Sequence, residues 1–365
     1  MKTGLITAVT AALCLGLTGP SMAREITVGA YTAPGSTPNA KGLFPGSKRI
    51  TEATNGELTF EIFTGGAMGG PKELLGNIGS GILDAGSVVV VYVKSALPTT
   101  DMLASLMVLR DDTKATVAAM NEMQLLHCPE CKAELERNNV VGLSWTGIAT
   151  VHMICRDPVK NLEELRRQKV IAPSGWGIAV KGLGATPISI TTAEMYEAMQ
   201  RGQADCAVGS PAWLDTYNLK DFSKELWSNP LGSYFGVMNW TFNRDVWNDL
   251  TDMEKKAFTD NLAQQVGDVT WGYEEDNNNA IATYVAANGP MTDPDQAFLD
   301  AWAEQQEKAV ATAIEKGKSA GIPNAEKNVT TYIGLVAKWM KIIEESDGSK
   351  EAYVEALQRE IFDKM

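Results

Sequence analysis

The chain has few of the residues from which metal centres and cofactor sites are built. Its 365 residues include only two histidines and five cysteines. Gly175-Trp176-Gly177 lacks the third glycine of a dinucleotide-binding fingerprint, and we find no phosphate-binding loop and no nucleophile elbow. Beyond the N-terminus, no stretch reaches the ~18 consecutive apolar residues of a membrane-spanning helix. We therefore expect no metal, no cofactor and no insertion of the mature chain into a membrane.

The N-terminus has the three parts of a secretory signal peptide. Lys2 supplies a positive start, residues 5–17 are apolar, and Ser21-Met22-Ala23 forms a small-residue cleavage site. Leu13 before Cys14 is unsuited to lipoprotein processing, so plain secretion is favoured over a lipid anchor. We predict a signal peptide over residues 1–23 and a mature protein in the periplasm.

Charge and length restrict the partners and the architecture. Loss of Lys2 with the signal peptide changes the net charge from −13 to −14, which disfavours nucleic acid and anionic membranes as partners. An acidic surface does not forbid an anionic ligand, because a pocket sets its own local potential. The mature chain is long enough for two lobes, each with a core of its own.

The cysteines left after export allow more than one interpretation. Cys128 and Cys131 enclose a Cys-Pro-Glu-Cys motif, which favours a local disulfide or a pair of unreactive thiols. Zinc would need about four ligands, and only His127 lies nearby. A periplasmic thiol oxidoreductase is the rival from another functional class, but its motif should open a helix, whereas this one follows the predicted helix 113–126. The sequence does not predict whether Cys155 and Cys206 are paired.

Hydrophobic periodicity predicts an α/β protein with two similar halves. Strands over 25–30, 58–63 and 85–93 alternate with helices over 43–54 and 72–80, and the same order recurs after Arg166. A helical pattern runs unbroken over residues 252–288, far beyond the mean helix length of ~11–12 residues, so we expect it to bridge both halves. We predict lobe I over 24–148 plus about 235–265, lobe II over 149–234 plus about 266–330, and C-terminal helices over 331–365.

Three motifs in order resemble one family of transport proteins. They are 56–70, a strand followed by a glycine-rich loop, with Asp84; 169–205, which contains KVIAP, LGATP and EMYEAMQRGQAD; and 242–250 (FNRDVWNDL). Together they resemble the DctP-like periplasmic solute-binding proteins of tripartite ATP-independent periplasmic (TRAP) transporters, and the resemblance extends over about residues 26–321. It implies a two-lobed periplasmic binding protein fold (type II-like), with an open mixed sheet flanked by helices in each lobe. It also implies capture of a small solute and delivery to membrane permease subunits, with no enzymatic activity.

The resemblance places the solute at strand ends between the lobes. The family's arginine, which clamps a substrate carboxylate, is replaced here by Ile171. The site residues that we expect are Val89, Tyr92, Trp145, His152, Ile171, Trp176, Ser210, Trp213, Tyr234, Phe235 and Asn239. For each aromatic residue and for His152, a place in the core is the competing interpretation.

The missing arginine indicates what the ligand is not. A buried carboxylate without a paired charge or several donors loses several kcal/mol to desolvation. We therefore predict a ligand that is not a simple carboxylate: a neutral or aromatic compound, or an amine held by cation–π contact. The alternative is an organic-acid binder, for a dicarboxylate or 2-oxo acid, with Arg156 or backbone donors as the clamp. A sensory role, in which bound solute is presented to a receptor, also stays open.

Overall fold

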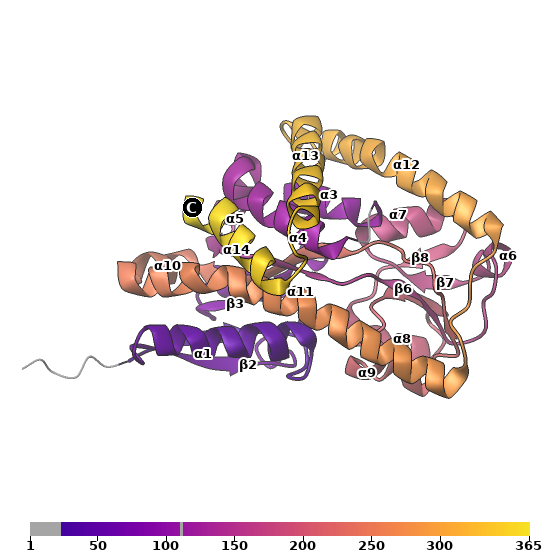
Figure 1. The fold of residues 1–365 in the computed structure, drawn as a ribbon, viewed down its shortest axis with the longest axis horizontal. Helices are drawn as coiled ribbons and strands as arrows, with labels where there is room; N and C mark the ends of the chain where they lie inside the picture. Colours follow the sequence, from indigo (N-terminus) through magenta and orange to yellow (C-terminus); the bar gives the residue numbers. More distant parts are fainter. Residues whose placement is uncertain (1–22, 110–111) are drawn as a thin grey trace, which may run out of the picture.

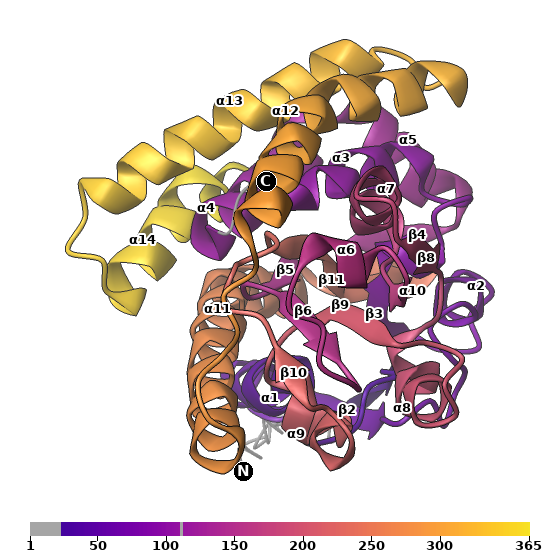
Figure 2. The same cartoon turned by 90° about the vertical axis from the view of Figure 1, so that its right-hand side faces the viewer.

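Two separate β-sheets, each flanked by helices, organise the chain (Figures 1 and 2). The structure is a computed structural model that describes residues 23–109 and 112–365. Apart from Ala23, the predicted signal peptide lies outside the described residues. The α/β class and the two-lobed architecture predicted from the sequence are confirmed, whereas the exact residue boundaries of the lobes stay a prediction.

The sheet of lobe I is mixed and has six strands. β1 pairs in parallel with β2 and β3, and β11 then adds antiparallel to β3, β4 and β5. The strands are β1 (Arg24–Gly29), β2 (Leu58–Phe63), β3 (Ala85–Val89), β4 (Val140–Gly142), β5 (Trp145–Ile148) and β11 (Tyr234–Asn243). β3 is shorter than the predicted strand 85–93, because the chain turns into the 3-10 segment η2 (Val90–Tyr92).

The sheet of lobe II has five strands in the order β10-β6-β9-β7-β8. They are β6 (His152–Cys155), β7 (Lys169–Ile171), β8 (Thr186–Ile188), β9 (Cys206–Gly209) and β10 (Glu225–Leu226). Cys155 and Cys206 are paired positions of the antiparallel strands β6 and β9, and a disulfide joins them. The sequence left this pairing open because the register that brings the two residues together is a tertiary feature.

Helices cover both sheets. Lobe I carries η1 (Pro38–Leu43), α1 (Phe44–Ala53), α2 (Leu74–Gly79), α3 (Pro98–Ala104), η3 (Ser105–Val108), α4 (Thr113–Glu122), η4 (Met123–His127), α5 (Pro129–Arg137) and α10 (Arg244–Asp249). Lobe II carries α6 (Leu162–Leu165), α7 (Ser174–Gly182), α8 (Thr192–Gln200), α9 (Trp213–Thr216) and η5 (Leu219–Asp221). The predicted capping box at the start of α8 is present, with Thr191 and Glu194 bonded to each other's backbone.

The Cys128–Cys131 motif lies at the junction of two helical segments and not only at the end of one. Pro129 occupies the first turn of α5, where its missing N–H costs nothing, so a new helix begins inside the motif. The expectation that the motif merely follows a helix was therefore wrong. The two cysteines form a disulfide and are almost fully buried.

The 37-residue helix α11 (Asp252–Asn288) runs past both sheets (Figure 1). A capping box between Thr251 and Glu254 starts the helix, and Gly289 ends it. It packs on α1 of lobe I, while Asn277 accepts hydrogen bonds from Ser210 Oγ and the Ala212 amide in lobe II. The predicted bridging helix is thus present over the predicted residues.

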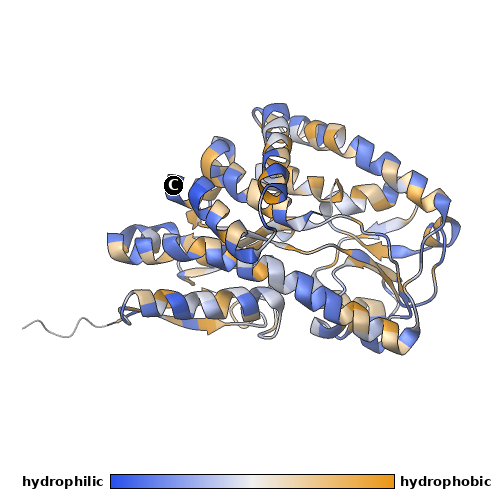
Figure 3. Cartoon of the chain, viewed as in Figure 1, coloured by the Kyte–Doolittle hydropathy of each residue, from blue (hydrophilic) through white to orange (hydrophobic). Residues whose placement is uncertain are grey.

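Three further helices end the chain, and the first of them packs on α7 of lobe II as well as on α3 of lobe I. They are α12 (Gln296–Ser319), α13 (Ala325–Glu344) and α14 (Lys350–Glu360), followed by η6 (Phe362–Lys364); α13 packs on α4 and α12, and α14 packs on α11 (Figure 2). Both α12 and α13 carry hydrophilic as well as hydrophobic residues along their length, as expected for helices with one face toward solvent (Figure 3). No helix among residues 23–109 and 112–365 is long and apolar enough to cross a membrane.

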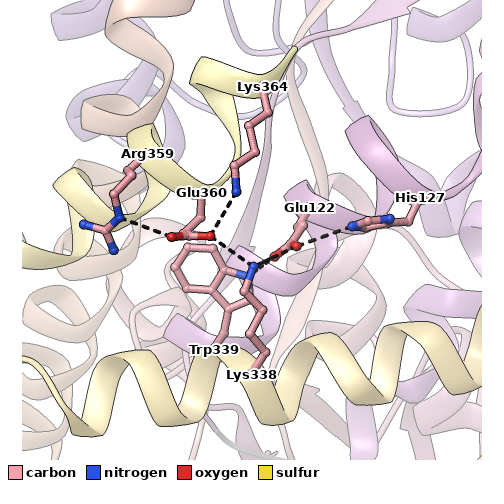
Figure 4. Close-up of polar contacts among 7 residues, drawn as sticks. All are labelled: Glu122, His127, Lys338, Trp339, Arg359, Glu360 and Lys364. Carbon is pink, nitrogen blue, oxygen red and sulfur yellow. Dashed lines mark hydrogen bonds and ion pairs between the residues drawn. The ribbon is translucent and has the colours of Figure 1, made fainter.

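A charged network fastens α13 and α14 to lobe I (Figure 4). The carboxylate of Glu122 on α4 accepts hydrogen bonds from Lys338 Nζ at 2.9 and 3.0 Å and from Trp339 Nε1 at 2.7 Å. Lys338 also reaches Glu360 at 3.4 Å. We call this network the ion-pair cluster; it consists of Glu122, His127, Lys338, Trp339, Arg359, Glu360 and Lys364.

Candidate functional site

A narrow cavity lies between the two sheets. It is lined by lobe I, by lobe II and by the bridging helix α11. Seven of its lining residues are aromatic, which makes the wall mainly apolar: Tyr31, Tyr92, Trp176, Trp213, Tyr217, Tyr234 and Tyr273.

Lobe I contributes its strand ends. Tyr31 follows β1, Val89 ends β3, and the turn of η2 brings Tyr92 to the same side. Tyr234 starts β11, where its hydroxyl accepts a hydrogen bond from the Val91 amide at 3.2 Å and donates to the carbonyl of Gly236 at 2.9 Å. These bonds fix the Tyr234 ring in the wall of the cavity.

Lobe II contributes the first turns of its helices. Trp176 lies on α7, and its indole Nε1 donates to the carbonyl of Leu231 at 2.7 Å. Thr192 is the first residue of α8, and Trp213 is the first residue of α9. Tyr273, from the middle of α11, completes the wall. The cavity therefore lies at strand ends and helix starts, which is where open α/β sheets bind ligands.

Two tyrosine hydroxyls bond to one threonine, and a third tyrosine lies in the same wall. Tyr31 Oη lies 3.1 Å from Thr192 Oγ1, the backbone amide of Thr192 donates to Tyr92 Oη at 3.1 Å, and Tyr217 lines the same cavity. We call these four residues the hydroxyl cluster. Because Tyr31 and Tyr92 belong to lobe I and Thr192 to lobe II, the cluster also joins the lobes across the cavity.

The wall of the cavity is uncharged. Among the residues that the structure describes, none of those lining it is an aspartate, glutamate, lysine, arginine or histidine. Burial raises the pKa of Tyr31, Tyr234 and Tyr273 well above the usual value for a phenol, and it raises the pKa of Tyr92 and Tyr217 as well. The phenols therefore stay protonated at neutral pH.

The structure brings five of the eleven predicted site residues together around this cavity. They are Val89, Tyr92, Trp176, Trp213 and Tyr234. Contact between these residues and a solute stays a prediction.

The other six predicted residues lie outside the cavity wall. Ile171 packs in the core of lobe II, and Pro173, two positions later, lines the cavity in its place. Phe235 stacks on Tyr332 at 5.2 Å between ring centroids, because successive side chains of β11 point to opposite faces. Asn239 is buried on the same strand, and its backbone N–H donates to the carbonyl of Ser144.

The remaining three of these six are held by structural hydrogen bonds. Trp145 is bonded through its backbone to the side chain of Asn121, and His152 Nδ1 lies 2.9 Å from the Trp227 carbonyl. Ser210 Oγ donates to Asn277 on α11 at 2.5 Å. These residues support the strands and the bridging helix around the cavity.

Arg156, the alternative clamp for an acid, also lies outside the cavity wall. It follows β6, and its guanidinium lies against Gly202 in the turn after α8. A basic group for a carboxylate is therefore absent from the cavity wall within the described part of the chain.

Sequence reasoning missed several lining residues. Tyr31 and Thr192 come directly after a strand and at a helix start, so the strand-end rule could have found them. Tyr217 and Tyr273 carry no such signal, because the packing of α9 and α11 places them.

Comparison with known proteins decides the family. A family model described as bacterial extracellular solute-binding protein, family 7 (DctP), matches residues 29–317. The chain belongs to this family. The resemblance to TRAP solute-binding proteins is thus confirmed; members of the family are periplasmic transport proteins, not enzymes, and they deliver small solutes to a membrane permease.

Two curated relatives of this family 7 protein match in sequence. The Salmonella typhimurium protein YiiZ, described as uncharacterized, is 28% identical over 208 residues, which is 56% of this chain and 62% of that protein. A solute-binding protein of Albidiferax ferrireducens is 19% identical over 257 residues, which is 69% of this chain and 74% of that protein.

Solved structures confirm the fold of this family 7 protein. A TRAP solute-binding protein from Bordetella bronchiseptica with bound (R)- and (S)-mandelate has a TM-score of 0.74 at 17% identity, covering 86% of this chain and 99% of that one. A marine metagenome protein specific for aromatic acids, with 3-hydroxybenzoate, has a TM-score of 0.77 at 20% identity, covering 87% and 99%. A Rhodoferax ferrireducens protein with copurified benzoate has a TM-score of 0.77 at 15% identity over the same shares.

Proposed function

We propose that this protein is the periplasmic solute-binding component of a TRAP transporter, exported by residues 1–23, and that its solute carries no simple carboxylate. It captures a neutral, aromatic or amine compound in the cavity between the lobes and delivers it to the membrane permease. The single observation that carries this ligand class is the cavity wall, which combines seven aromatic residues with no charged side chain among the described residues.

Energetics supports the exclusion of a simple acid. A carboxylate in this cavity would leave water without meeting a guanidinium or ammonium group, at a cost of several kcal/mol. The position at which the resemblance places the family's arginine holds Ile171 in the core of lobe II, and no arginine lines the cavity among the described residues. The structural neighbours that were solved with benzoate, mandelate or 3-hydroxybenzoate share the fold with this chain at 15–20% identity, so their ligands do not transfer to it.

A ligand screen tests the proposal. Mature protein is screened by thermal shift against acids, amines, neutral polyols and aromatic compounds, because a ligand of the folded state raises the melting temperature. Calorimetry then gives Kd for each compound that raises it. High-affinity binding of a dicarboxylate or 2-oxo acid, at sub-micromolar Kd, would overturn the proposal and favour the organic-acid alternative.

One substitution in the cavity tests the site with a matched control. Trp176→Ala should weaken the identified ligand by about tenfold or more, because a buried aromatic contact is lost. Trp247→Ala is the control, since Trp247 packs on Phe242 and Phe258 outside the cavity. Equal losses of affinity in the two variants would show that Trp176 does not contact the ligand.

A further inference from the structure

The hydroxyl cluster is one polar part of the cavity wall. Thr192 is within hydrogen-bond distance of Tyr31 and Tyr92, while Thr32 and Ser87 add further hydroxyl groups to the lining. A ligand that fills the cavity thus meets hydroxyl groups and several aromatic faces.

The hydroxyl cluster can both donate and accept hydrogen bonds. Each of its four hydroxyls has one proton and two lone pairs. The bond between Tyr31 and Thr192 uses one of these protons, and the Thr192 amide donates to Tyr92. Protons and lone pairs therefore both remain, which suits a group that can donate as well as accept.

The cluster offers no formal charge to balance an ion of either sign. Asp276, on α11 beyond Tyr273, accepts a hydrogen bond from Thr37 at 2.6 Å, and Glu194 is engaged in the capping box of α8. An ammonium group in the cavity would lack an oppositely charged partner, just as a carboxylate would. An uncharged head group avoids both costs.

Two pairs of rings stand beside the cluster. Trp176 and Tyr234 lie 6.3 Å apart between ring centroids, and Trp213 and Tyr217 lie 5.7 Å apart at an interplanar angle of 69°. Such rings favour another aromatic ring, by stacked or edge contacts.

We propose that the solute is an uncharged aromatic compound with a hydroxyl group, a phenol or aryl alcohol, whose hydroxyl joins the hydroxyl cluster while its ring packs against Trp176 and Trp213. This inference rests on the proposed function and specifies its ligand class. The hydroxyl donates to a free lone pair of the cluster and accepts a hydrogen bond from one of the remaining cluster hydroxyls, so both of its hydrogen-bonding functions are met.

A series of compounds on one scaffold tests the head group. Benzyl alcohol, benzoate, benzylamine (as its ammonium form at neutral pH) and toluene share the ring and one carbon, and differ only in the polar group. Calorimetry on mature protein should give benzyl alcohol a Kd at least about tenfold below that of each of the other three, the difference expected for satisfied hydrogen bonds and no buried charge.

The outcomes separate this inference from the proposed function. Tightest binding of benzylamine or toluene overturns the inference and leaves the proposed function intact. Tightest binding of benzoate overturns both. Failure of all four compounds to bind overturns the inference, while the wider screen still decides the proposed function.

Substitutions in the hydroxyl cluster test whether it contacts the hydroxyl group of the ligand. Thr192→Val and Tyr217→Phe keep the shape of the side chain. Each should raise the Kd for benzyl alcohol about tenfold and change the Kd for toluene by less than about twofold. Tyr196→Phe is the control, because the Tyr196 hydroxyl on the outside of α8 bonds to Asp221 and not to the cavity. Equal effects of Thr192→Val on benzyl alcohol and toluene would overturn the inference, and circular dichroism checks that each variant is folded.

Discussion

The hydroxyl cluster and the ion-pair cluster both join distant parts of the chain, yet they are built from opposite chemistry. The hydroxyl cluster joins lobe I to lobe II with neutral hydroxyls. The ion-pair cluster joins α4 to α13 and α14 with full charges on Glu122, Lys338 and Glu360 (Figure 4). The protein thus uses paired charges where helices are fixed to each other, and has no charged side chain in the cavity wall where a solute is expected.

The largest loss of stability should come from placing a charge in the core of lobe II, beside the cavity. Ile171 is 1% exposed in the core of lobe II, so Ile171→Arg would bury an unpaired guanidinium. We expect a loss of about 4 kcal/mol or more in the free energy of unfolding, measured by urea denaturation. Ile171→Val is the control, with an expected loss of about 1 kcal/mol. A stable Ile171→Arg protein would mean that this position reaches solvent or a ligand.

Removing one partner of the ion-pair cluster should have the next largest effect. Lys338→Met leaves the buried Glu122 carboxylate with Trp339 as its main donor, and we expect a loss of about 3 kcal/mol in the free energy of unfolding. Lys341→Met, on the exposed face of the same helix, should cost less than about 0.5 kcal/mol. Similar losses in the two variants would show that the ion-pair cluster adds no more stability than a surface pair.

The two clusters should also respond differently to pH. Hydrogen bonds from Lys364 and Arg359 lower the pKa of Glu360 to about 2, below its value in an unfolded chain. The stability that Glu360 contributes is therefore complete above about pH 4.5 and is lost as the pH falls toward 2. The difference in unfolding free energy between wild type and Glu360→Gln should shrink across that window, whereas a constant difference would contradict the assignment.

In contrast to the stability contributed by Glu360, ligand affinity should not depend on pH. Because burial raises the pKa of the cavity tyrosines, Kd for an uncharged ligand should be constant between about pH 5 and pH 9. A Kd that changes with pH within that range would show that a titrating group contacts the ligand.

The smallest change in ligand affinity is expected from removing the Cys128–Cys131 disulfide. Cys128 and Cys131 line no part of the cavity between the lobes, so replacing both with serine should change ligand affinity by no more than about threefold. Calorimetry on the folded double variant measures this. Complete loss of binding by a folded variant would contradict the structural role of the pair.

Much of the fold could be predicted from the sequence, because its signals are local. The capping box of Thr191 and Glu194 and the unbroken pattern of residues 252–288 each specify a helix through neighbours in the chain. The site was less predictable. Tyr92, Trp176 and Trp213 lie at strand ends and helix starts, whereas Tyr273 reaches the cavity only because α11 packs against both lobes.

The errors in the predicted site have a common physical cause. Ile171 and Phe235 are next to cavity positions in the sequence, but a strand turns alternate side chains to opposite faces. Reading the site without knowing each strand's orientation therefore selects core residues together with lining residues.

The place of β11 in the sheet of lobe I has a consequence for how the chain folds. β11 pairs with β3, β4 and β5, but it comes after every strand of lobe II in the sequence. The pairing of Val89 with Val237 closes a loop that contains every strand of the lobe II sheet. Such non-local pairing is slow because the chain loses the entropy of closing this long loop before the paired strands stabilise it. The sheet of lobe II can form while the chain is still emerging, and lobe I has to wait for its central strand.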